Sequence, residues 1–272
     1  MESMYYYIHS IDTQNEIIIM LKKYFEKRDT KWFFIRYWYG GPHLRVRFSN
    51  SNCKQEILQI FKSFEKKINR VREMSSEEYY RNHTFDGEKI DYESLPWYLQ
   101  GEIVEETYEP EYHRYGKDLV LMKNEQIFQT SSEIIGTLIE MGSSMQVRLI
   151  YAYFLLKRVI DTIGSVEDKT SFLEQYYVYW KNFKQSENQK LNLSNLETYV
   201  ERIEHQLNNQ KLKMLLEKLD NQLLQLKSSV NDSSTFYYML SSQIHMTNNR
   251  LSVPPWVEGE LANFMRGQQQ GR

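Results

Sequence analysis

The sequence predicts an α+β fold, in which an N-terminal antiparallel sheet or hairpin layer with helices is followed by a mostly helical C-terminal half. Alternating apolar and polar residues on both sides of a Gly-Gly-Pro turn indicate a β-hairpin over residues 32–48. Apolar residues at helical spacing flank this hairpin, and helical spacing prevails after Glu109-Pro110, where β-branched runs are few. The length of 272 residues fits one large domain or two small ones. The residue pattern places an α/β part at 1–117, a helical part at 118–267 and a flexible tail at 268–272.

The α/β part is expected to alternate strands with amphipathic helices, bounded by capping and turn residues. In chain order the expected elements are a strand at residues 4–10, a helix capped by Asp12 or Thr13 that ends near Arg28, the hairpin, a helix at 52–69, and loops with short strands at 73–107.

The C-terminal half carries apolar residues at helical spacing almost throughout. The expected helical segments are 119–141, 145–163, 169–183, a long apolar stripe over 195–227, and a final helix that begins near Thr235. The stripe, which includes Leu207, is interpreted as a packing surface against the domain or a partner helix rather than as a cofactor site. The serine-rich segment 228–234 is expected to form a loop, and residues 268–272 a frayed tail.

Charge and cysteine content exclude several classes of function. Lys and Arg number 34 against 36 Asp and Glu, so the net charge of −2 does not indicate a nucleic-acid-binding protein. The single cysteine, Cys53, excludes an internal disulfide and a cysteine-rich zinc site, and no metal is implied. A signal-peptide pattern is absent, and the longest aliphatic run, Ile17 to Leu21, is too short for a bilayer. We expect a cytoplasmic protein without membrane or direct nucleic-acid partners.

The second strand of the hairpin separates apolar from basic side chains, because successive residues of a strand point to opposite faces. Leu44, Val46 and Phe48 share one face, and His43, Arg45 and Arg47 share the other. Two arginines held in parallel have the geometry to bind a carboxylate or a phosphate, since each guanidinium presents several fixed donors. An ordinary edge hairpin with a solvated basic face is the alternative.

Two further segments concentrate ionisable residues. In a helix over residues 235–252, His245 and Asn249 stack on one face, where an imidazole can exchange a proton near neutral pH. The alternative is a histidine that only satisfies a hydrogen bond in the core. The segment Tyr108–Gly116 places two carboxylates, a histidine and an arginine around a proline-marked extended stretch, with a solvated loop as the alternative. Signatures of kinases, hydrolases and zinc enzymes are absent from the sequence.

Three groups of residues, taken in order, resemble a known family. They are Phe34–Tyr37 with Pro42–Arg47, Tyr108–Glu111 leading into Arg114–Gly116, and His245–Met246 with Asn249–Leu251. The chain resembles the C-terminal domain of class I lantibiotic dehydratases over nearly its entire length, as a standalone version of the kind found in thiopeptide biosynthesis. It departs from the family pattern at Lys117, where a second glycine usually follows Gly116, and in extra residues between the hairpin and Tyr108.

The resemblance implies a lyase that removes glutamate from glutamylated Ser or Thr of a ribosomal precursor peptide and leaves dehydroalanine or dehydrobutyrine. By motif position, the implied catalytic residues are Arg45, Arg47, Arg114 and His245. The implied substrate-binding residues are Arg36, His43, Glu111, Asn249 and Arg250. In this chemistry arginines stabilise enolate-like charge and clamp the glutamyl carboxylate, while the histidine serves as base or acid. We therefore expect the guanidinium groups and the imidazole to meet in one cleft.

The resemblance also implies the partners. They are a precursor peptide with its leader and a separate glutamylating dehydratase that uses glutamyl-tRNA; the elimination needs no cofactor, and a homodimer is compatible with the sequence. One alternative is a pyridine synthase, which joins two dehydroalanines by a formal aza-cycloaddition and releases the leader, and a second is a noncatalytic peptide-binding scaffold. The complete set of arginines and histidine favours elimination, because the cyclisation has no glutamate carboxylate to clamp.

Overall fold

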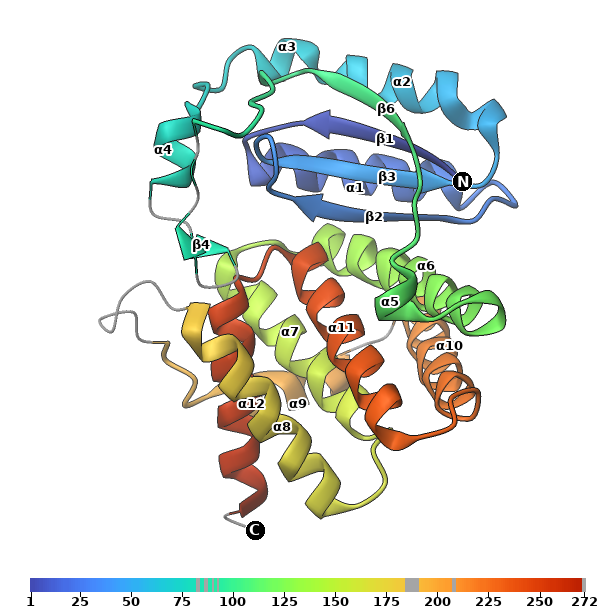
Figure 1. Ribbon diagram of the computed structural model, residues 1–272, viewed down its shortest axis with the longest axis vertical. Helices are drawn as coiled ribbons and strands as arrows, with labels where there is room; N and C mark the ends of the chain where they lie inside the picture. Colours follow the sequence, from blue (N-terminus) through green and yellow to red (C-terminus); the bar gives the residue numbers. More distant parts are fainter. Residues whose placement is uncertain are drawn as a thin grey trace. The chain divides into compact units, whose positions relative to one another are not determined.

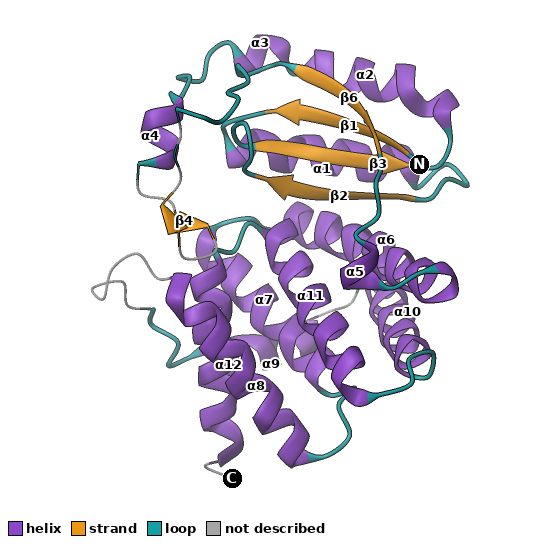
Figure 2. Cartoon of the chain, in the orientation of Figure 1, coloured by secondary structure: helices purple, strands orange, loops and turns teal. Residues whose placement is uncertain are grey.

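The computed structural model describes residues 1–81, 84–85, 88–89, 91, 93–183, 191–206 and 209–270. The chain divides into two compact units, which we call the N-terminal unit and the helical unit. The N-terminal unit comprises Met1–Pro110 with Ile139–Ser143, and the helical unit comprises Glu111–Leu138 with Ser144–Arg272. All described strands belong to the N-terminal unit, as Figure 2 shows, so the predicted α+β class is confirmed. Among the described residues, no helix has the length and apolar character needed to cross a bilayer.

The N-terminal unit is built on a four-stranded antiparallel sheet with the strand order β2-β3-β1-β6 (Figure 1). Its strands are β1 (Glu2–Tyr7), β2 (Trp32–Tyr37), β3 (His43–Phe48) and β6 (Ile103–Thr107). The predicted hairpin of β2 and β3 is confirmed, and Ile35 and Tyr5 lie opposite Arg45 on its two neighbouring strands. A separate two-stranded sheet pairs β4 (Thr84–Phe85) with β5 (Glu88–Lys89).

The helices of this unit begin and end at capping residues that differ in part from those predicted. They are α1 (Ile11–Phe25), η1 (Ser51–Cys53), α2 (Lys54–Ser63), α3 (Glu65–Ile68) and α4 (Ser76–Tyr80). Ser10 caps α1 by accepting a hydrogen bond from the backbone of Thr13, so the predicted caps Asp12 and Thr13 are wrong and lie in the first turn. The predicted helix 52–69 is interrupted at Phe64, whose backbone ends α2 and begins α3.

One face of the sheet forms the core of the N-terminal unit with α1 and α2. Leu44, Val46 and Phe48 are fully buried, as their alternation predicts. The Tyr6 ring stacks on Phe61 of α2 at 4.5 Å, and other aromatic residues pack between the sheet and α1. This packing leaves His43, Arg45 and Arg47 on the opposite face.

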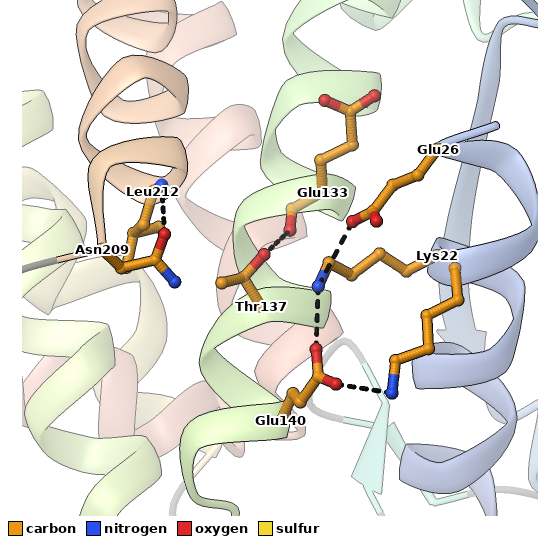
Figure 3. A network of polar contacts seen from close by, with 8 residues as sticks. Lys22, Glu26, Glu133, Thr137, Glu140, Asn209 and Leu212 are labelled. Carbon is orange, nitrogen blue, oxygen red and sulfur yellow. Dashed lines mark hydrogen bonds and ion pairs between the residues drawn. The ribbon is translucent and has the colours of Figure 1, made fainter. Parts of the chain in front are cut away.

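Ion pairs hold the last turn of α6 (Asp118–Met141) within the N-terminal unit (Figure 3). The Nζ atom of buried Lys22 lies 2.9 Å from Glu140 Oε2 and 3.3 Å from Glu26 Oε1. Lys23 Nζ lies 2.6 Å from the other oxygen of Glu140, and hydrogen bonds from Lys23 and Lys22 lower the pKa of this carboxyl. Lys22 is thus neutralised where it is buried, which limits its desolvation cost.

The helical unit contains the remaining helices, which Figure 1 draws from green to red. Besides α6 they are α5 (Tyr112–Tyr115), α7 (Met145–Ile160), α8 (Val166–Trp180), η2 (Lys181–Phe183), α9 (Leu196–Gln206), α10 (Gln210–Lys227), α11 (Ser233–Leu251) and α12 (Pro255–Gln270). The leucines of α10 that belong to the predicted packing stripe are buried, which confirms the stripe: Leu212, Leu215, Leu216, Leu219, Leu223 and Leu226. Leu224, on the other side of α10, is exposed, and Leu207 lies outside the described residues.

Two predictions for this unit are wrong. Residues 112–115 form the helical turn α5 rather than an extended stretch. The helix that begins near Thr235 is also not the final one, because the left-handed backbone of Ser252 (φ 58°) ends α11 and Pro255 begins α12. Residues 268–270 therefore belong to a helix rather than to a frayed tail, and 271–272 lie outside the described residues.

Gly116 ends α5 with φ 75° and ψ −166°, a backbone conformation that favours glycine strongly. A Cβ atom at this position would also lie 2.9 Å from Val120 Cγ1. We expect Gly116→Ala to lower the free energy of unfolding by about 1–3 kcal/mol, measured by denaturant unfolding.

Gly164→Ala is the matched control, because no atom lies within 4 Å of the Cβ position there. This variant is expected to change stability by less than about 1 kcal/mol. Equal effects of the two alanines would contradict the role of the Gly116 backbone.

Candidate functional site

Arg45 lies on the second face of the sheet, held between two aromatic rings. Its Cζ atom is 3.6 Å from the ring centroid of Tyr37 and 4.3 Å from that of Tyr5. Its Nε–H donates to His43 Nε2 at 3.0 Å. Arg45 is partly exposed, and within the described part of the chain no carboxylate forms an ion pair with it. Arg45 is therefore a fixed cation that can accept an anionic ligand.

His43 is a neutral, fully buried support for Arg45. Burial lowers the pKa of His43 to about 3. The hydrogen bond that the ring donates to the Gly41 carbonyl opposes this shift, and the charge of Arg45 reinforces it. The neutral ring accepts at Nε2 from Arg45, so Nδ1 carries the proton and donates to the Gly41 carbonyl at 2.8 Å. Tyr7 packs against the same ring at 4.4 Å.

Arg47 shares the face of Arg45, whereas Arg36 does not. The Cζ atom of Arg47 lies 4.7 Å from the Tyr108 ring centroid and 5.5 Å from that of Phe33. Arg36 lies opposite Leu44 on the core face, where it is buried and donates at 2.6 Å to a side-chain oxygen of each of two residues of α1. These hydrogen bonds attach β2 to α1. A substrate-binding role for Arg36 stays a prediction.

In the helical unit, α5 and α11 carry the predicted charged residues. Arg114 is partly exposed and its Nε atom lies 3.3 Å from Glu111 Oε2, one helical turn earlier. Arg250 is fully buried, with its Cζ atom 5.5 Å from the ring centroid of Phe128. Tyr115 contacts the same Phe128 ring edge-on at 4.8 Å, and burial raises the pKa of Tyr115. The environment of Arg250 is thus that of a core residue.

His245 on α11 pairs with a buried carboxylate from α12. Its Nδ1 atom lies 3.0 Å from Glu258 Oε1, and its ring stacks on the Trp180 ring of α8 at 4.4 Å and 19°. The His245 side chain is 22% exposed, whereas that of Glu258 is 0% exposed. Asn249, one turn further along α11, is also partly exposed. A partly exposed imidazole with a buried carboxylate partner is suited to proton transfer.

Sequence reasoning missed Glu258 and the residues around it. Tyr176 of α8 donates its hydroxyl hydrogen bond to Glu258 Oε2 at 2.5 Å, and burial, followed by the charge of Glu258, raises the pKa of Tyr176 well above its usual range. The missed signal was the helical spacing of buried Val257, Leu261 and Met265 directly after Pro255. Without α12, nothing in the sequence placed a carboxylate near His245.

The structure brings some predicted site residues into contact. His43 contacts Arg45 directly, and Arg47 lies on the same face of the sheet. Glu111 contacts Arg114 on α5, and His245, Asn249 and Arg250 lie on α11. The predicted meeting of the arginines with His245 in one cleft stays a prediction.

The family model described as "Lantibiotic biosynthesis dehydratase C-term" matches residues 4–268 of this chain. The chain belongs to this lantibiotic dehydratase C-terminal family. The resemblance seen in three sequence segments is thereby confirmed. A search of curated protein sequences found no match to this chain.

Two solved structures have folds similar to that of this chain. One is "Pyridine synthase, TbtD, from thiomuracin biosynthesis", with a TM-score of 0.63 and 12% identity over 99% of this chain and 98% of that chain. The other is the tRNA-dependent lantibiotic dehydratase MibB from Microbispora sp. 107891, with a TM-score of 0.58 and 16% identity over 99% of this chain and 28% of that chain. The family member thus corresponds to about a quarter of the MibB chain.

The buried neutral His43 is expected to make the N-terminal unit acid-sensitive. Its pKa of about 3 lies below the ordinary value of 6.5, so between these values the unfolded chain binds a proton that the folded chain excludes. Stability is therefore fully present above about pH 6.5 and falls as the pH falls, by about 2 kcal/mol between pH 6.5 and 5. Denaturant unfolding at these two pH values measures the loss.

His43→Gln is expected to remove most of this pH dependence, although burial also lowers the pKa of His9, which keeps a part of it. The matched control is His113→Gln, because His113 is exposed. Equal pH dependence in the two variants would contradict a neutral buried His43.

Proposed function

We propose that the chain removes glutamate from glutamylated Ser or Thr side chains of a ribosomal precursor peptide and leaves dehydroalanine or dehydrobutyrine. The observation that carries the proposal is the fixed, partly exposed Arg45, clamped by Tyr5 and Tyr37 and hydrogen-bonded to neutral His43. A preplaced guanidinium of this kind suits a reaction in which negative charge develops, and the departure of a glutamate carboxylate is such a reaction.

The reaction is a β-elimination. The base takes the proton from Cα, the electron pair of the Cα–H bond becomes the new Cα–Cβ double bond, and the Cβ–O bond breaks with its pair going to the departing glutamate carboxylate. Negative charge develops on the amide next to Cα and on the leaving group. Cations that are already in place stabilise this charge without reorganising, which lowers the barrier.

We assign a role to each predicted catalytic residue. Arg45 and Arg47, which share one face of the sheet, stabilise the developing negative charge. Arg114 binds the carboxylate of the glutamyl side chain, in exchange for its loose contact with Glu111 at 3.3 Å. His245 transfers the proton, because a neutral imidazole both accepts and donates near neutral pH.

The substrate has to come from a glutamylating enzyme, because this chemistry starts from an ester that is already formed. We propose that a separate partner uses glutamyl-tRNA for that step and passes on the precursor peptide with its leader. The net charge of −2 fits this division, since the chain has no excess of basic residues for a general attraction to tRNA. Family membership supports a precursor peptide as the substrate class.

The second candidate function is a pyridine synthase, which joins two dehydroalanines of one peptide and releases the leader. The observation in its favour is the match to TbtD, which extends over 98% of that chain, whereas the match to MibB extends over 28%. Elimination stays our first proposal because a cyclisation between two neutral alkenes does not use the clamped Arg45 in the same way. A peptide-binding scaffold without catalysis is the third candidate.

Incubation of the purified protein with a glutamylated precursor peptide is expected to release glutamate and leave dehydroamino acids, as measured by mass spectrometry. Arg45→Ala and His245→Ala are each expected to slow this conversion by about 100-fold or more, because they remove a preplaced cation or the proton-transfer group. The matched controls are Arg72→Ala and His113→Ala, since both side chains are exposed.

Other substrates separate the candidate functions. Persistence of the glutamyl ester in the presence of the wild-type protein would contradict elimination. Release of the leader from a fully dehydrated peptide would establish the pyridine synthase instead. Tight binding of both peptides without conversion of either would indicate the scaffold.

A further inference from the structure

We infer that Glu258 is a positioning residue for His245: it holds the Nδ1–H tautomer of the imidazole, so that Nε2 is the nitrogen that accepts a proton. Tyr176 holds Glu258 in turn. The inference about the tautomer concerns the protein alone, and its catalytic consequence rests on the proposed function.

The contacts form a chain across three helices. His245 of α11 meets Glu258 Oε1 of α12 at 3.0 Å, and Tyr176 of α8 donates to Glu258 Oε2 at 2.5 Å. Each carboxylate oxygen therefore has its own donor. Glu258 is 1% exposed, so these donors replace the water that a carboxylate otherwise binds.

The direction of these hydrogen bonds follows from the groups involved. An ionised carboxylate only accepts, so the hydrogen between His245 and Glu258 belongs to Nδ1. The Tyr176 hydroxyl keeps its proton, since burial raises the pKa of Tyr176. Nε2 of the neutral His245 ring then has a lone pair and faces away from Glu258, because the two nitrogens lie on different edges of the ring.

Neighbouring residues restrict the imidazole further. The stack on Trp180, at 4.4 Å and 19°, limits rotation of the His245 ring out of its plane. Gly259 permits this approach of α12 to α8, because a Cβ atom there would lie 3.2 Å from Trp180 Cβ. Of the described residues, Glu258 of α12 is the titratable group whose hydrogen bond to the ring is observed, and Tyr176 of α8 contacts Glu258. This arrangement resembles that of a catalytic triad, in which a buried carboxylate fixes the tautomer and orientation of a histidine.

Nitrogen-15 NMR of the full chain with labelled histidine tests the tautomer without any substrate. The His245 signals are identified by their absence in His245→Gln. The wild-type spectrum is expected to show Nδ1 protonated and Nε2 unprotonated in the neutral ring. Glu258→Gln is expected to shift the population toward the Nε2–H tautomer, because an amide can also donate to Nδ1.

Tyr176→Phe is a second variant that keeps the aromatic ring and the Glu258 carboxylate, and it is expected to shift the His245 signals less. Glu260→Gln on α12 and Tyr179→Phe on α8 are the matched controls and should leave them unchanged; Tyr179 is 57% exposed. An Nε2–H tautomer in the wild type, or unchanged signals in Glu258→Gln, would overturn the inference.

Kinetics with the glutamylated peptide test the catalytic consequence. Glu258→Gln is expected to lower kcat by about 100-fold and to change KM by less than about threefold, because it disturbs proton transfer rather than substrate binding. A rise in KM with unchanged kcat would overturn the positioning role. If the wild type does not convert this substrate at all, the proposed elimination fails, and the NMR result still decides the tautomer.

Discussion

The pairing register of β3 is the constraint on which the N-terminal unit depends. β3 pairs with β2 and β1, and this register places Arg45 opposite Ile35 and Tyr5. Its apolar residues must point into the core under α1 and α2, so its basic residues must point to the other face. A slip by one residue would bury Arg45 and Arg47 in the apolar layer without partners, which costs several kcal/mol per charge. Burial of one face therefore dictates the chemistry of the other.

Aromatic neighbours turn this basic face into a set of oriented donors. A free arginine side chain samples many rotamers, whereas Arg45 is restricted by Tyr5, Tyr37 and the acceptor Nε2 of His43. The low pKa of His43 is part of this arrangement, because a protonated ring would lose its acceptor and repel Arg45. Burial of His43 thus orients the charge of Arg45, and a charge held in place is what the proposed stabilisation of developing negative charge requires.

In the helical unit, the carboxylate of Glu258 is buried among helices and requires hydrogen-bond donors there. Tyr176 and His245 each satisfy one oxygen of Glu258. The same contacts that limit the cost of burying Glu258 also orient His245, whose side chain keeps 22% exposure. The same hydrogen bonds therefore serve stability and chemistry, because an apolar residue in place of Glu258 would leave the buried Tyr176 hydroxyl without this acceptor and the imidazole without its orienting partner.

The sequence by itself determined the α+β class, the hairpin, the two faces of β3 and most of the helices, because these depend on residues within one or two turns of each other. Its three motif segments also indicated the family. Only the tertiary structure showed that Arg36 forms hydrogen bonds to α1 on the core face of the sheet, and that His245 pairs with Glu258. The second pairing depends on how the chain turns between Ser252 and Pro255 and on how α12 packs against α8, and such long-range packing has no signature in the local residue pattern.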